Sequence, residues 1–141
     1  MKLSTKGRYG LRAAVDLALF ATDEPISINS IALREGLSES YLEQLFAKLK
    51  KAGLVSSSRG TNGGYRLVGD VLRALEGDML LVNCPDNEDM CAKFDSCVTK
   101  YVWKRINNSI NEAMDSMTLE EIVANSHPGD DQNHPEAYCS K

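Results

Sequence analysis

The sequence predicts a mainly α-helical fold that carries one small β-hairpin. Apolar residues recur at helical spacing over the first fifty residues and again after residue 98. A glycine-rich loop at residues 59–65 separates two short segments with strand character. The chain has 141 residues, is 43% hydrophobic and 26% charged, and has no apolar run of membrane-spanning length. These properties indicate one soluble globular domain, with room for a small appendage.

The first helix is expected to begin near Ser4 or Thr5. It should end before Asp23, because Pro25 disfavours helical geometry at Glu24. Its apolar positions at helical spacing are Leu11, Ala14, Val15, Ala18 and Leu19.

A second, short helix can be capped by Ser27 and stopped by a left-handed Gly36. A third helix then follows, capped by Ser38 or Ser40 and ended by Gly53. If Ser40 is the cap, the glutamate three residues later completes a capping box. The expected inward residues are Ile28, Ile31 and Ala32 in the second helix, and Leu42, Leu45, Phe46 and Leu49 in the third.

The outward face of this third helix carries short or hydrogen-bonding residues first and cations toward its end. Such an order suits a helix whose N-terminal end meets base edges in DNA, although any surface helix has a polar face. The outward residues are Ser40, Glu43, Gln44, Ala47, Lys48 and Lys51.

The predicted hairpin pairs residues 54–58 with residues 65–67. A hairpin placed directly after two packed helices is the plan of a winged helix-turn-helix. Arg59 lies at the edge of this wing, where a guanidinium can enter a minor groove. The alternative is a surface hairpin with a solvated arginine.

Beyond the wing, Asp70 is expected to cap a short helix that closes at Gly77. A longer helix is predicted at residues 98–117, followed by a short one at residues 118–123. Too little chain remains to cover the apolar stripe of the long helix, so a second protomer is the economical cover, giving a homodimer. The stripe consists of Val102, Ile106, Ile110, Ala113 and Met117.

Charge is distributed unevenly along the chain. The net charge of −4 combines +4 over residues 1–67 with −8 over residues 68–141, so the first half is the one that can face phosphates. The N-terminus has no apolar core followed by a cleavage site, and we expect a cytoplasmic protein in which thiols stay reduced.

Three of the four cysteines, Cys84, Cys91 and Cys97, lie within fourteen residues. Clustered thiolates favour an iron–sulfur cluster or zinc, and the CxxC pairs typical of structural zinc are missing. Free or disulfide-switching thiols are the remaining alternative. A small thiol or metal enzyme is a poor fit, because no redox CxxC pair or paired catalytic carboxylates occur.

The motifs at residues 4–10, 37–45 and 59–65 resemble those of the Rrf-type transcriptional regulators. Residues 71–77 and 118–123 also fit, and the resemblance covers about nine-tenths of the chain. It implies a dimeric winged-helix regulator, usually a repressor, that binds pseudo-palindromic promoter DNA. The DNA-binding residues carried over or expected on these grounds are Lys6, Ser38, Ser40, Tyr41, Glu43, Gln44, Lys48, Arg59 and Gly60.

Within this family, three cysteines in this segment mark the members that bind an iron–sulfur cluster. The resemblance is nearest to IscR-like members, which implies 2Fe–2S rather than the 4Fe–4S of NsrR-like members. The fourth ligand is unknown, because Lys100 stands where the IscR-like pattern has histidine and an ammonium cannot ligate. Asp86, Asp95, a partner side chain or an exogenous group are the candidates. The alternative is a cluster-free, CymR-like regulator of cysteine metabolism that acts through a protein partner.

The expected organisation is a winged helix-turn-helix domain at residues 1–77 and a cysteine-rich sensor loop at 78–97. The dimerisation and terminal helices follow at 98–124, and the polar tail at 125–141 is expected to be disordered. Family members usually have about ten more residues between the wing and the next helix. Either the chain is truly shortened here or mobile residues are omitted; because a direct join of Leu67 to Val68 leaves the wing strand little path back, we favour the omission.

Overall fold

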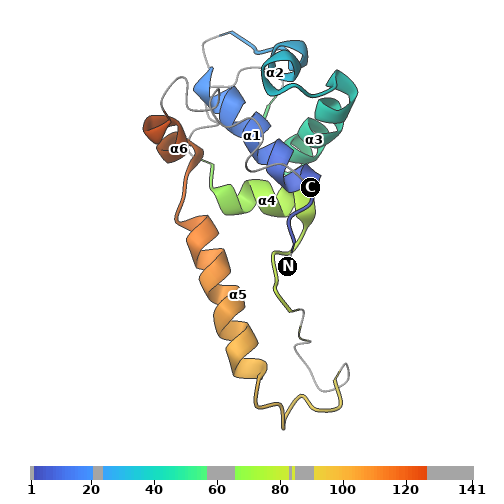
Figure 1. Ribbon diagram of the computed structural model, residues 1–141, viewed down its shortest axis with the longest axis vertical. Helices are drawn as coiled ribbons and strands as arrows, with labels where there is room; N and C mark the ends of the chain where they lie inside the picture. The colour runs from blue at the N-terminus through green and yellow to red at the C-terminus, as the bar shows by residue number, and fades with distance from the viewer. Residues whose placement is uncertain (1, 21–23, 57–65, 83, 85–90, 127–141) are drawn as a thin grey trace.

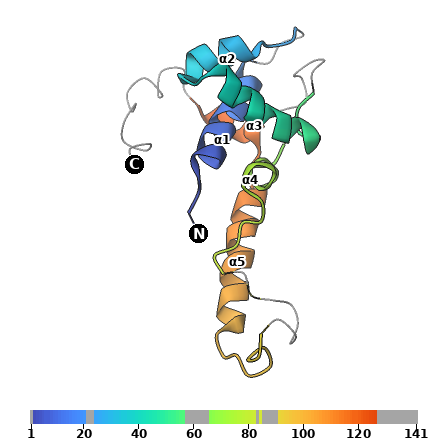
Figure 2. The same cartoon turned by 90° about the vertical axis from the view of Figure 1, so that its right-hand side faces the viewer.

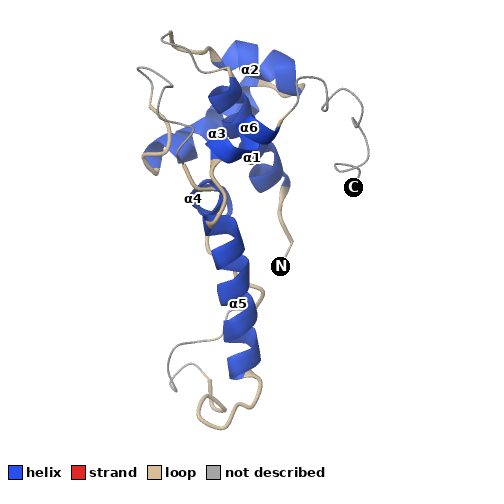
Figure 3. Cartoon of the chain, turned by 90° about the vertical axis from the view of Figure 1, so that its left-hand side faces the viewer, coloured by secondary structure: helices blue, strands red, loops and turns tan. Residues whose placement is uncertain are grey.

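The computed structural model describes residues 2–20, 24–56, 66–82, 84 and 91–126, and its regular elements there are helices (Figures 1 and 3). The helices α1 to α4 and α6 form a body, and α5 projects from it as a single arm (Figure 1). Their bounds are α1 Thr5–Leu19, α2 Ile28–Glu35, α3 Glu39–Lys51, α4 Val68–Glu76, α5 Lys100–Asp115 and α6 Leu119–Asn125.

The predicted helix ends in the first half of the chain are confirmed. Ser4 and Ser27 cap α1 and α2, each accepting a backbone N–H of the first turn. Gly36 closes α2 with a left-handed φ of 64°, which a residue without a side chain adopts at little cost. For α3 the cap is Ser38, so the capping box centred on Ser40 does not form.

The start of α4 differs from the prediction that Asp70 caps it. The helix begins earlier, at Val68, and its N-cap residue is Leu67. An antiparallel bridge between Leu67 and Thr118 fixes this start, and the Asp70 carboxylate pairs with Arg73 instead of capping. The same bridge ties Leu67 to the body, and because residues 57–65 lie outside the described residues, the omission of residues between Leu67 and Val68 stays a prediction.

The predicted wing falls largely outside the described residues, which omit 57–65 and therefore Arg59 and Gly60. Residues 54–56 are described and form no strand. The arm α5 is shorter than the predicted 98–117, because residues 98 and 99 lie in a turn before it and the helix ends at Asp115.

The core of the body lies where α1, α2, α3 and α4 meet. Its largest fully buried side chains are Ile31, Leu42, Leu45, Leu49 and Val71. α4 crosses α1 at close range, since a side chain at Gly10 would collide with Leu75 and one at Gly7 would meet the Glu76 carboxylate at 2.6 Å. The two glycines of the first sequence motif therefore serve helix packing.

Candidate nucleic-acid interface and cysteine segment

α3 presents the polar face that the sequence predicts. Its inner side is fixed by Leu42, Leu45 and Leu49, each at most 2% exposed. Ser38, at its N-cap, is also exposed. The candidate base-reading and phosphate-binding residues that remain exposed on the helix are Ser40, Glu43, Gln44 and Lys48. The body thus holds α3 from one side and leaves its other side exposed, as a helix that enters a groove of DNA requires.

Tyr41 is less exposed than the other candidate DNA-binding residues on α3. It is half-buried, with its ring edge-on to that of Tyr9 at a centroid distance of 6.4 Å and an interplanar angle of 83°. Its hydroxyl is buried and meets no hydrogen-bonding partner among the described residues. Tyr41 therefore braces the start of α3 against α1, and a base contact by this residue stays a prediction.

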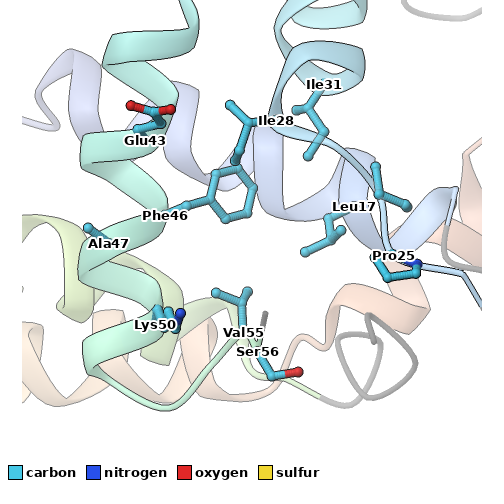
Figure 4. A pocket seen from close by; sticks show the side chains of 11 residues that line it. Leu17, Pro25, Ile28, Ile31, Glu43, Phe46, Ala47, Lys50, Val55 and Ser56 are labelled. Carbon is cyan, nitrogen blue, oxygen red and sulfur yellow. The ribbon is translucent and has the colours of Figure 1, made fainter. Parts of the chain in front are cut away.

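An apolar hollow of about 380 Å³ borders the recognition face (Figure 4). It lies between α1, α2 and α3, with Phe46 on its wall and Glu43, Lys50 and Ser56 as its charged or hydroxyl-bearing residues. Few polar groups converge on the hollow, so it has little means of orienting a small polar ligand.

The N-terminus of α1, which carries the predicted phosphate contact Lys6, is held by Glu76 at the end of α4. The Glu76 carboxylate accepts hydrogen bonds from the Ser4 hydroxyl, the Ser4 N–H and the Gly7 N–H, the last at 2.8 Å. Partial burial raises the pKa of Glu76, but these hydrogen bonds and the nearby Lys6 outweigh it, so the net pKa is lowered. Lys6 itself is exposed.

The three cysteines of the sensor segment are free thiols and partly exposed. Among the described residues, no three His, Cys, Asp or Glu side chains gather closely enough to hold a metal ion. The Cys97 sulfur lies 3.5 Å from the Thr99 hydroxyl. Hydrogen bonds from Thr99, followed by the backbone and charge of Lys100, lower the pKa of Cys97 and favour its thiolate.

Lys100, which occupies the position of a histidine in the IscR-like pattern, is engaged elsewhere. Its ammonium donates to the Phe94 carbonyl at 3.0 Å and lies 3.7 Å above the centre of the Phe94 ring. The candidate Asp95 is exposed. Asp86, His127, His134 and Cys139 lie outside the described residues.

Sequence reasoning missed the residues that join the cysteine segment to the body. Asn107 and Asn111 on α5 bond the backbone that follows α4, and Arg73 bonds Asn111. A signal was present, since asparagine is a poor residue for the middle of a helix and these two lie four positions apart, on one face.

A helical body that exposes a polar recognition helix, joined to a projecting arm, is the arrangement of a DNA-binding transcriptional regulator. Residues 3–125 match the family model of Rrf2, described as iron-dependent transcriptional regulators. The chain belongs to the Rrf2 family.

Relatives of this chain are also named transcriptional regulators. It is 39% identical over 131 residues to the HTH-type transcriptional regulator IscR of Vibrio campbellii, covering 87% of this chain and 77% of that protein. It is 40% identical over 131 residues to IscR of Aliivibrio salmonicida, covering 87% and 75%. These relatives are transcriptional regulators and not enzymes.

Two solved structures confirm the helical fold. CymR, the global cysteine regulator of B. subtilis, superposes with a TM-score of 0.70 at 36% identity, covering 90% of this chain and 99% of that one. IscR of T. potens superposes with a TM-score of 0.63 at 39% identity, covering 92% and 94%. In the described part of the chain, no helix is both long and apolar enough to span a membrane.

Proposed function

We propose that this protein is a homodimeric transcriptional repressor that senses iron–sulfur cluster or redox status through Cys84, Cys91 and Cys97. The observation that carries the proposal is the combination, in one chain, of an exposed polar face on α3 with three free thiols in the segment that precedes the arm α5. The proposal includes the division of the chain into a DNA-binding domain at residues 1–77, a sensor loop at 78–97, dimerisation and terminal helices at 98–124, and a tail at 125–141. We expect the protein to act in the cytoplasm.

The donor set fits an iron–sulfur cluster, preferably 2Fe–2S, because thiolates are its usual ligands and all three thiols are free. When bound, such a cluster supplies a link between thiolates that is lost with oxidation or iron shortage. Since the described residues do not gather these ligands, the segment has to draw Cys84, Cys91 and Cys97 together.

On the DNA side, we propose that Ser38, Ser40, Tyr41, Glu43 and Gln44 read base edges or orient the helix that does so. Lys6 and Lys48 would neutralise phosphates, and Arg59 and Gly60 of the predicted wing would enter the minor groove. The twofold partner would place its α3 about 34 Å away, one duplex turn along. A small rotation of the arms then alters both half-site contacts at once.

Replacement of Cys91 by Ala tests the proposal. The anaerobically purified wild type should show visible absorption and bind promoter DNA with strong salt dependence. Cys91→Ala should lose the absorption and change its choice of operator, while Cys139→Ala, the same change outside the segment, should do neither. Identical spectra and identical DNA-binding profiles for wild type and Cys91→Ala would contradict cluster sensing.

The second candidate is a cluster-free regulator of cysteine metabolism that acts through a protein partner. The likeness to the B. subtilis global cysteine regulator and the ungathered cysteines favour it. Under this alternative, the anaerobically purified protein is colourless and still binds promoter DNA. The same absorption spectrum therefore separates the two candidates.

A further inference from the structure

Two asparagine side chains on α5 hold the backbone that runs from α4 toward Cys84. The Asn107 amide oxygen accepts the Leu81 N–H at 2.8 Å, and its nitrogen donates to the Val82 carbonyl at 3.0 Å. Asn111 donates to the Met79 carbonyl at 3.3 Å. This backbone lies in no helix or strand, so the two amides supply partners that secondary structure would otherwise give.

Asn111 also connects this backbone to α4. Its amide oxygen accepts from Arg73 at 3.0 Å, and the same guanidinium bonds the carboxylates of Asp70 and Asp115. The hydrogen bond with Asp115 is the main cause of the raised pKa of Arg73. A side chain at Gly69 would collide with Asp115, so the junction of α4 and α5 is closely packed.

Both ends of the cysteine segment, residues 84–97, are therefore tied to α5. Cys84 comes two residues after Val82, and Cys97 comes three residues before Lys100, where α5 begins. Asn107 lies seven residues further along α5, a rise of about 10 Å. Figures 1 and 2 show the chain after α4 running alongside the arm. A change that draws Cys84 and Cys97 together would therefore pull on backbone that the Asn107 hydrogen bonds hold.

The last turn of α4, which carries Arg73, also touches α3. The Lys48 ammonium on α3 lies 3.4 Å from the Leu75 carbonyl of α4. Val71 and Leu75 are buried in the core that α3 shares. Because packed cores move as units rather than deform smoothly, a shift of α4 carries α3 with it.

We infer that Asn107 and Asn111 form a clamp that couples the cysteine segment to the recognition helix, through Arg73 and α4. The inference rests on the proposed function and names the residues that transmit the state of its sensor. The hydrogen bonds of the two asparagines are with Arg73 and with backbone groups of Met79, Leu81, Val82 and α5, so they act as positioning residues.

The test compares wild type with the double variant Asn107→Ala/Asn111→Ala and with Asn107→Asp. Asn107→Asp keeps the acceptor for Leu81 but loses the donor to Val82. Asn108→Ala is the matched control, because this neighbouring asparagine is exposed on the same helix. For each protein, operator affinity is measured with and without the cluster, and hydrogen exchange of the Leu81 amide is followed in the cluster-free protein.

In wild type and Asn108→Ala we expect the cluster to change operator affinity about fivefold or more. In the double variant the change should fall below about twofold, with cluster-free affinity kept and Leu81 exchanging faster. The cluster-dependent change in operator affinity of Asn107→Asp should lie between those of the wild type and the double variant. If the double variant does not fold, Asn107→Asp provides the test. A cluster-dependent change in its operator affinity as large as that of the wild type then overturns the inference.

Failure of the proposed function and failure of the clamp give different results. A wild type whose operator affinity ignores the cluster overturns the proposed function and, with it, the coupling. A wild type that responds, beside a folded double variant that responds equally, overturns the clamp alone. Unchanged Leu81 exchange in the double variant also overturns the clamp, whatever the cluster does.

Discussion

At the scale of single residues, Glu43 is the side chain on α3 with the clearest chemical restriction. It is exposed and, when ionised, it can only accept hydrogen bonds. Such a group accepts from the amino group of cytosine and repels phosphate, so it discriminates among sequences more than it attracts DNA.

Glu43→Ala should therefore broaden the choice of operator without abolishing binding. We expect substitutions at the contacted base pair to cost less than the usual 1–3 kcal/mol, roughly, in the variant. Binding titrations across a set of operator variants measure this. Glu112→Ala removes the same charge from exposed α5 and should keep the wild-type ranking; the role of Glu43 is refuted if its variant keeps that ranking too.

Glu76 links the pH dependence of stability to the start of α1. Because its folded pKa is lowered, its contribution is fully present above the unfolded value of 4.5 and is lost as pH falls through the folded pKa. Glu76→Gln should cost about 1–2 kcal/mol of unfolding free energy at pH 7, and less in acid. Urea unfolding at pH 7 and pH 3 checks this, and an equal loss at both pH values would contradict it.

At the scale of elements, the arm α5 carries large apolar side chains on its surface. Tyr101 is 68% exposed and Val102 is 43% exposed, whereas Ile110 packs against the core. Met114 is buried where the predicted stripe used Met117, which is itself 40% exposed. The body thus covers the end of α5 nearest to it and leaves the outer end for another surface.

Val102→Glu should turn the proposed dimer into a monomer. A twofold interface meets the substitution twice, so two carboxylates enter one apolar seam. Sedimentation velocity measures the change, and circular dichroism checks that helix content is kept. Lys104→Glu, an exposed charge change on the same helix, should remain dimeric. A dimer that survives Val102→Glu would rule out this face as the interface.

At the scale of the whole molecule, α4 is the element that brings the two halves together. It packs against α1, α3 and α5, and its last turn carries both Glu76, at the start of α1, and Arg73, at the arm. The basic first half and the acidic second half therefore meet at this short helix, and they meet again where α6 packs against α1. Such a helix is well placed to relay a change in the arm to the recognition face.

Local sequence signals were reliable where a short-range rule decides the structure. Ser4 and Ser27 follow from side-chain capping, and Gly36 follows from its freedom to adopt a left-handed φ. The prediction for Asp70 was wrong, because the bridge of Leu67 to a residue fifty-one positions later sets the start of α4. A prediction made from neighbouring residues cannot anticipate a contact with Thr118.

The sequence by itself determined the helices, the buried stripe of α3 and the family, because periodicity, caps and motifs are local properties of the chain. Only the tertiary structure decided which polar side chains become partners. Asp16 lies 5% exposed within α1 because Arg34 of α2 reaches it, and Asn107 bonds a backbone more than twenty residues away. Such pairings depend on how the helices pack, so they appear only once the chain is folded.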